Sequence, residues 1–176
     1  MSPKLPSRKE IFCGFVSSAK IIYRYLYSMN EIDFHPAQLY KPEIRFVDID
    51  AAGIVNNATY FNYFEQSRIH FFEGVVGKKW DWMTAGMVIA RHEIDYLRPI
   101  LFNDDVVIVT WMDVAGTKSM QAHYEIKKFS RDRWVSVAKA KTVMVSYDHE
   151  TGRSVPWHPD LLKAFEGFEM KIPANE

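Results

Sequence analysis

The stretch that decides the fold runs from residue 48 to residue 68 and reads DIDAAGIVNNATYFNYFEQSR. It follows residues 44–46, whose apolar side chains alternate as in a strand, and it begins with two acids, Asp48 and Asp50. Small residues and two asparagines come next, and from Ala58 the apolar positions take helical spacing. We therefore expect a strand that ends in a carboxylate to lead into a very apolar helix over residues 58–76.

This junction is the only part of the chain that points to chemistry. The start of a helix has backbone N–H groups without partners and carries the positive end of the helix dipole. Beside a fixed carboxylate, such a site can hold a carbonyl oxygen and present the carboxylate to the carbon next to it.

Outward from the helix, alternation of apolar and polar side chains predicts four more strands, over residues 87–97, 106–114, 119–129 and 134–147. Tight turns join these strands, so neighbours must be mainly antiparallel. With residues 38–47 as the first strand, the sheet has five strands. Because the helix is apolar nearly all round, the sheet has to curl around it. The predicted class is α+β, a curled five-stranded sheet around one long central helix, with a short helix at residues 161–165.

The strand at residues 87–97 shows strict alternation. This pattern predicts that its even-numbered residues, from Val88 to Tyr96, share one face.

Residues 1–37 are expected to form an extension that precedes a domain over residues 38–168 and a tail over residues 169–176. An amphipathic helix is predicted at residues 11–29, packed on the domain or on a sister subunit. Its apolar run is too short to span a bilayer. The basic side chains on its polar face leave a weak membrane-surface contact as the alternative.

Composition argues against several classes of function. The 176 residues hold 22 Lys and Arg and 22 Asp and Glu, so nothing in the net charge calls for nucleic acid. The single cysteine, Cys13, is typical of a chain from a reducing, cytoplasmic compartment. The six histidines show no ligand spacing and the glycine-rich nucleotide loops are missing, so neither a metal site nor a cofactor is expected.

The stretch FVDIDAAGIVNNATYFNYFEQSR closely resembles the signature of hotdog-fold acyl-CoA thioesterases of the 4-hydroxybenzoyl-CoA thioesterase type. The likeness continues in register through residues 95–99 (DYLRP), 103–105 (NDD) and 116–119 (GTKS), and covers about residues 40–165. The resemblance implies a hotdog fold, hydrolysis of an acyl-CoA thioester to free acid and coenzyme A in lipid metabolism, and a homodimer or homotetramer.

The resemblance also implies roles for particular residues. Asp50 would be the catalytic carboxylate, acting as the nucleophile or as a general base, and the backbone N–H near Asn57 would receive the thioester carbonyl. Asp48 is expected to be a surface or salt-bridge acid. Some relatives carry a histidine at the position of Ile54 or of Asn57, and this chain carries neither.

The other candidate residues are expected to bind substrate. Gly53 would provide backbone geometry, and the two asparagines either cap the helix or bind substrate. Glu65 is a second candidate carboxylate, although an ion pair with Arg68 is the preferred interpretation. Two residues of a hairpin could meet the phosphates of coenzyme A. The full set is Gly53, Val55, Asn56, Asn57, Tyr60, Glu65, Lys118 and Ser119.

The sequence leaves two rival functions open. A hotdog dehydratase would normally need a histidine–acid pair, and no histidine lies near Asp50 in the sequence. A hotdog protein that binds acyl-CoA or scaffolds an assembly, without turning the thioester over, is the rival from another class.

Overall fold

The structure is a computed structural model that describes residues 37–83, 85–114 and 116–166. The predicted helix at residues 11–29 and the tail at residues 169–176 lie outside the described residues.

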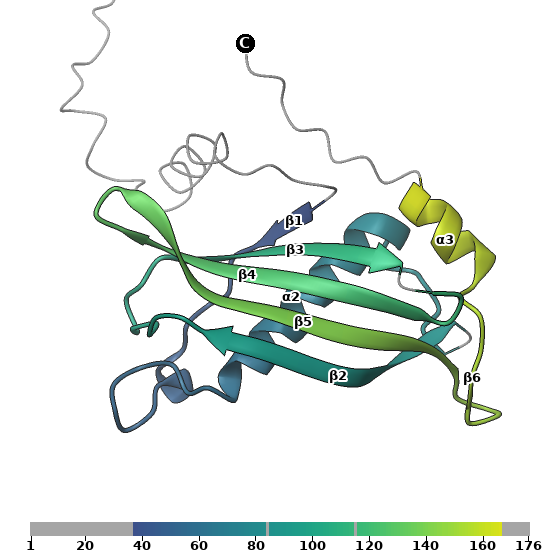
Figure 1. Ribbon diagram of the computed structural model, residues 1–176, viewed down its shortest axis with the longest axis horizontal. Coiled ribbons are helices and arrows are strands. Elements are labelled where there is room, and N and C mark those ends of the chain that lie inside the picture. The colour runs from purple at the N-terminus through teal and green to yellow at the C-terminus, as the bar shows by residue number, and fades with distance from the viewer. Residues whose placement is uncertain (1–36, 84, 115, 167–176) are drawn as a thin grey trace, which may run out of the picture. The chain divides into compact units, whose positions relative to one another are not determined.

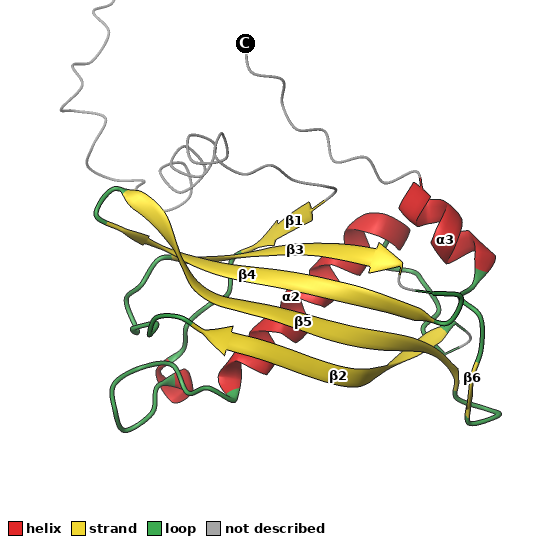
Figure 2. Ribbon diagram, viewed as in Figure 1, coloured by secondary structure: helices red, strands yellow, loops and turns green. Residues whose placement is uncertain are grey.

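The described residues form one antiparallel sheet with a long helix lying across one face (Figures 1 and 2). The strands follow the order β1-β3-β4-β5-β2, and β6 pairs with β5. Their bounds are β1 (Ala37–Tyr40), β2 (Gly86–Tyr96), β3 (Val106–Val114), β4 (Ser119–Ser130), β5 (Arg133–Asp148) and β6 (Arg153–Ser154). The helices are η3, a 3-10 turn (Phe46–Asp48), α2 (Thr59–Val76) and α3 (Pro159–Glu166). The predicted α+β class is confirmed, and β6 is a sixth strand that the sequence did not predict.

Helix α2 forms the centre of the core because apolar side chains cover most of its circumference. Phe64 is buried and its ring lies 4.6 Å from that of Tyr124 on β4. The buried hydroxyl of Ser67 lies 2.6 Å from the hydroxyl of Thr110 on β3, so both polar groups have a partner. The helix ends at Gly77, whose φ of +79° suits a glycine.

The first strand is shorter than predicted, and the expectation that a strand leads directly into the acids was wrong. Strand β1 ends at Tyr40, and Pro42, which has no N–H to donate to a sheet, follows it. The chain then closes into the 3-10 turn η3, in which the N–H of Asp48 donates to the carbonyl of Arg45 at 2.9 Å.

A β-bulge in β2 corrects the predicted faces of that strand. Ile89 lies opposite Met144 and His92 opposite Thr142, so Ala90 is an extra residue in the ladder. Met144 and Thr142 are both buried against the helix side. The residues of β2 that face α2 are therefore Met87 and Ile89 before the bulge, and His92, Ile94 and Tyr96 after it.

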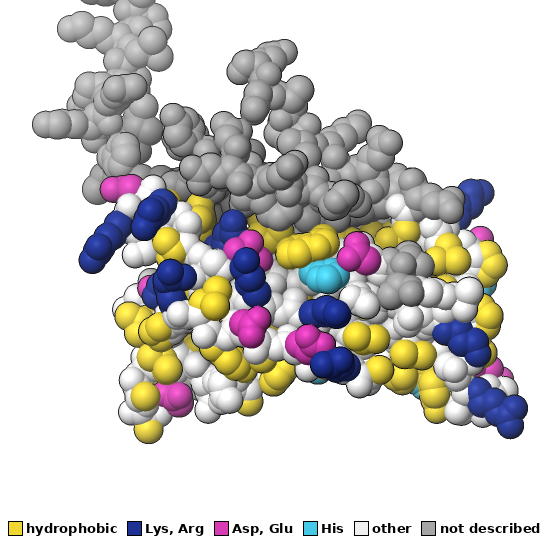
Figure 3. All heavy atoms as spheres, in the orientation of Figure 1, with side chains coloured by type: hydrophobic (Ala, Val, Ile, Leu, Met, Phe, Trp, Pro, Cys, Tyr) yellow, Lys and Arg dark blue, Asp and Glu magenta, His cyan; other side chains and the backbone are white. Residues whose placement is uncertain are grey.

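Strands β1 and β2 are the two edges of the sheet, and they are covered unequally. Helix α2 crosses the sheet obliquely and makes its main contacts with β1 and β3 (Figure 1). As a result, apolar side chains on the helix side of β2 stay exposed, including Ile89 at 39% and Tyr96 at 46%. The opposite face of the sheet carries both signs of charge (Figure 3), with ion pairs such as Lys127–Glu125 at 3.6 Å.

Candidate active site

The segment from Asp48 to Asn56 forms a narrow closed loop. The N–H of Asn56 donates to the carbonyl of Asp48 at 2.8 Å, and the N–H of Asp50 donates to the carbonyl of Ile54 at 2.8 Å. Gly53 sits at the tip with φ of +77°, a conformation that side chains rarely adopt. This positive φ agrees with the backbone role predicted for Gly53.

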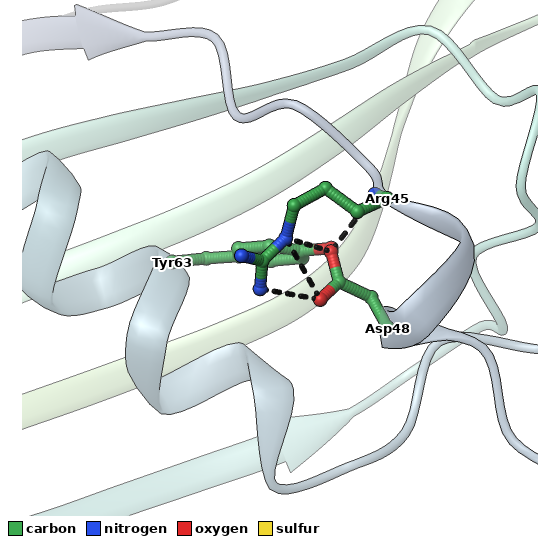
Figure 4. Close-up of polar contacts among 3 residues, drawn as sticks. All are labelled: Arg45, Asp48 and Tyr63. Carbon is green, nitrogen blue, oxygen red and sulfur yellow. Dashed lines mark hydrogen bonds and ion pairs between the residues drawn. The ribbon is translucent and has the colours of Figure 1, made fainter.

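Asp48 anchors this loop to helix α2 (Figure 4). One carboxylate oxygen, Oδ2, accepts hydrogen bonds from the backbone N–H of Arg45 and from the Tyr63 hydroxyl, each at 2.9 Å. The other, Oδ1, accepts from Nη2 of Arg45 at 2.7 Å. The salt bridge was predicted, but the surface position was wrong, since Asp48 is only 2% exposed.

The electrostatics of this cluster favour a charged Asp48. Burial alone would raise the pKa of the Asp48 carboxyl, but hydrogen bonds from Arg45 and Tyr63 outweigh burial and hold that pKa below its ordinary value. Burial and the neighbouring carboxylate both raise the pKa of Tyr63, so its hydroxyl stays protonated as a donor.

Asp50 lies at the mouth of a cleft beside the start of α2. Its Oδ1 accepts the N–H of Ala52 at 2.8 Å, and within the described residues its Oδ2 has no hydrogen-bond or ion-pair partner. The cleft is a cavity of about 490 Å³ lined by Asp50, Ile54, Val55, Asn57, Tyr60, Tyr96, Leu97, Arg98 and Pro99. It therefore brings Asp50, Val55, Asn57 and Tyr60, all predicted site residues, around one space.

The start of helix α2 separates the roles of the two asparagines. The side chain of Asn56 accepts the N–H of Ala58 at 2.9 Å, which is an Asx turn just before the helix, and Ala58, the N-cap of α2, has no side-chain cap bond. The carbonyl of Asn57 accepts the Tyr96 hydroxyl at 3.0 Å, which ties the helix start to the end of β2. Among the described residues, the backbone N–H of Asn57 has no acceptor. This N–H is available to a ligand in the cleft.

The structure separates other predicted site residues from Asp50. The Glu65–Arg68 ion pair does not form, because Arg68 turns inward and donates to the Tyr124 hydroxyl at 3.1 Å while Glu65 stays exposed. Lys118 precedes β4 and Ser119 is the first residue of that strand, and neither lines the cleft of Asp50.

A second cavity, of about 450 Å³, lies at the other end of the space between α2 and β2. Its lining includes Glu65, Arg68, Ile69, Phe72, Trp82, Met87, Ile89 and His149. Between the two cavities the ring of Phe61 lies 5.0 Å from that of His92, a contact between the middle of β2 and the first turns of α2. Within one chain the two spaces are therefore separate.

Several residues of this region were not predicted. The cleft is also lined by four residues of the DYLRP stretch that carries part of the family resemblance: Tyr96, Leu97, Arg98 and Pro99. The bond from the Tyr63 hydroxyl to Asp48 joins residues 15 apart and has no local signal in the sequence.

No cluster of three or more His, Cys, Asp or Glu side chains that could hold a metal occurs within the described ranges. In the same part of the chain, no helix is long and apolar enough to cross a membrane.

Residues 44–165 match a family model described as the thioesterase-like superfamily. The uncharacterized protein YsmA of Bacillus subtilis is 30% identical over 119 residues, 66% of this chain and 77% of that protein. A thioesterase of Thermus thermophilus, solved with coenzyme A and zinc, is 30% identical with a TM-score of 0.61, over 72% of this chain and 95% of that one. A 4-hydroxybenzoyl-CoA thioesterase mutant, solved with 4-hydroxybenzoyl-CoA, has a TM-score of 0.68 at 16% identity, over 74% of this chain and 99% of that one. These likenesses confirm the predicted hotdog fold.

Proposed function

This chain belongs to the thioesterase-like superfamily, and on that basis we propose that it hydrolyses an acyl-CoA thioester to a free acid and coenzyme A, with Asp50 as the catalytic carboxylate. One observation carries the proposal: Asp50 lines a single cleft together with Asn57, just before α2, and Tyr60 in its first turn. Coenzyme A is the ligand named for the Thermus thermophilus relative, which supports it as the thiol part of the substrate.

The proposed chemistry uses the two sides of the cleft differently. The thioester carbonyl accepts the N–H of Asn57, at the positive end of the α2 dipole, so negative charge that develops on its oxygen is stabilised. Oδ2 of Asp50 then either attacks the carbonyl carbon and expels the coenzyme A thiolate, leaving an anhydride that water cleaves, or takes a proton from the water that attacks. Both routes consume one water and need no other reactant.

The test is release of free thiol by the purified full-length chain from a panel of aromatic, short-chain and long-chain acyl-CoAs. We expect at least one ester to be hydrolysed catalytically. If the protein binds acyl-CoA tightly but releases no thiol from any member, the proposal is wrong and the non-catalytic binding class replaces it.

We further propose that the protein is at least a homodimer, paired through the β2 edge. Strand β2 is long, lies at an open edge and exposes apolar side chains on its helix side. A twofold axis would run the two β2 strands antiparallel. The end of β2 that carries Tyr96, beside the Asp50 cleft, would then meet the partner's end that carries Met87, beside the second cavity.

Light scattering tests this assembly directly. A monomer at micromolar concentration with full activity would contradict the proposed dimer.

We also propose a cytoplasmic location and a role in lipid metabolism, since the chain has a single cysteine and acyl-CoAs are products of lipid chemistry. Fractionation of cells that contain the protein would disprove this if the protein sedimented entirely with membranes or appeared outside the cell.

A further inference from the structure

Arg68 is a buried cation with little compensation. It lies on α2 and is only 9% exposed. Its Nη1 donates to the Tyr124 hydroxyl at 3.1 Å, and no carboxylate of the described residues lies within ion-pair distance of its guanidinium. A guanidinium has about five N–H donors in a planar fork, so most of its hydrogen-bonding capacity is unused here.

Such an arrangement is unfavourable unless something else compensates it. An arginine as buried as this one is rare without an opposite charge beside it, and its unpaired nitrogens, which are not among the fully buried polar atoms that lack a partner, remain accessible to a ligand. The Tyr124 hydroxyl is neutral and accepts a single bond, so it does not cancel the charge.

The guanidinium also lines a space that a ligand can enter. The second cavity holds about 450 Å³, and the apolar side chains of Ile69, Phe72 and Met87 are among its walls. The two acids that line this cavity, Glu65 and Glu73, do not neutralise Arg68. Glu73 pairs with Lys78 at 3.9 Å, and Glu65 is exposed and lies beyond ion-pair distance of Arg68.

We propose that Arg68 binds a carboxylate at the far end of the acyl chain, so that the preferred substrates are coenzyme A monothioesters of dicarboxylic acids. This inference rests on the proposed thioesterase function. A carboxylate accepts two parallel N–H bonds from a guanidinium and supplies the missing negative charge. The methylene chain between the two ends of such an acid would contact the apolar walls.

The proposed dimer gives this substrate a continuous path. Within one chain the Phe61–His92 contact separates the Asp50 cleft from the cavity of Arg68. In an antiparallel β2 pair the cleft of one protomer faces the cavity of the other. An acyl chain held at Asp50 would then extend towards the partner's Arg68.

The test compares pairs of esters that differ only in the terminal carboxylate: succinyl- with butyryl-CoA, adipoyl- with hexanoyl-CoA and suberoyl- with octanoyl-CoA. For wild type we expect a kcat/KM ratio that favours the carboxylate ester by about tenfold or more at the chain length that reaches Arg68, the scale of one charged hydrogen bond. Arg68→Met should lower this ratio by about the same factor. Arg133→Met removes an exposed guanidinium at the start of β5 and should leave the ratio unchanged.

Several outcomes would overturn the inference. One is a wild-type kcat/KM that is higher for the apolar ester than for the carboxylate ester at every chain length. This outcome would be decisive even if the Arg68→Met variant failed to fold. Another is an Arg68→Met variant that folds and keeps the wild-type ratio. A third is an equal loss on both esters together with dissociation of the dimer, because Arg68 would then pair with a carboxylate of the partner subunit.

A binding measurement separates this inference from the proposed function. In the Asp50→Asn variant, calorimetric Kd values for adipoyl-CoA and hexanoyl-CoA should differ by about tenfold, and adding Arg68→Met should remove the difference. If the wild type hydrolyses no ester but this difference in Kd is found, the proposed thioesterase function is wrong, and the proposal that Arg68 binds a carboxylate is kept. Equal Kd values for every pair would overturn carboxylate recognition alone.

Discussion

Replacing Asp48 by asparagine should destabilise the protein, although the change preserves size. The carboxylate is 2% exposed and accepts hydrogen bonds on both oxygens. An asparagine amide group must replace one of them. In one orientation it faces Nη2 of Arg45, and in the other it faces the backbone N–H of Arg45 and the Tyr63 hydroxyl. Either way a donor meets a donor, and at least one hydrogen bond to a charged group is lost.

The loss of one such bond corresponds to about 1.5–3 kcal/mol in the free energy of unfolding. For a domain of this size, each kcal/mol shifts Tm by about 2–4 °C, so Asp48→Asn should lower Tm by about 3–12 °C. The assay is thermal denaturation of the full chain at neutral pH. Asp50→Asn is the matched control, since its one bond, from the N–H of Ala52, can be kept by the asparagine carbonyl. If the two variants had the same Tm as wild type, the anchoring role of Asp48 would be refuted.

The same pair of proteins gives a pH test. Because the folded-state pKa of Asp48 lies below its ordinary value, its stabilisation is complete above that ordinary value, about 3.9. It is lost as the pH falls through the lower folded value. The gap in free energy of unfolding between wild type and Asp48→Asn should therefore be constant near neutrality and close only in acid. A gap that closed between pH 8 and 6 would contradict this assignment.

Three further predictions concern other parts of the chain. Burial, and then the charge of Arg68, lower the pKa of His92, so NMR titration should give a pKa below 6.5 and Arg68→Met should raise it. The free energy of unfolding should decrease as the pH drops below 6.5, where the unfolded state takes up the proton more readily. A His92 pKa above 6.5 would contradict this. Gly53→Ala should lower the free energy of unfolding, measured with denaturant, by about 1–2 kcal/mol. Backbone strain alone is the cause, because an added Cβ would meet no atom within 4 Å. An unchanged free energy of unfolding would show that the loop tip relaxes freely. Deleting residues 1–35 should lower Tm while thiol release persists, if the predicted helix at residues 11–29 packs on the domain; intact protein that co-sediments with anionic vesicles would favour the membrane-surface alternative.

Regular patterns explain why most of the fold could be predicted from the sequence. Apolar residues at helical spacing defined α2 to within a residue, and alternation defined β3, β4 and β5 to within one or two. The errors arose where one residue changed the local geometry. Pro42 follows the early end of β1, and because of the extra residue Ala90 the side chains of β2 that face the helix are odd-numbered before the bulge and even-numbered after it. Periodicity within a segment cannot detect a bulge, because the bulge is defined by the neighbouring strand.

The candidate site was predictable where its residues are close in sequence. Asp50, Gly53 and Asn57 belong to one motif and line or shape one cleft. The contacts that join distant segments were not predictable. The bond from the Tyr63 hydroxyl to Asp48 joins residues 15 apart on two different elements, and the spacing within either element does not indicate it. Arg68 was paired with Glu65 by spacing alone, whereas packing against β4 turns it towards Tyr124.

The turnover number of Asp50→Asn tests the central claim most directly. The asparagine keeps the shape of the loop and its bond to Ala52, but it can neither attack the thioester nor accept a proton from water. With the best acyl-CoA of the panel, we predict that kcat falls by about a hundredfold or more while Kd for that ester and Tm change little. An Asp50→Asn variant that folds and keeps the wild-type kcat would contradict the assignment, and Glu65 would be the next carboxylate to test.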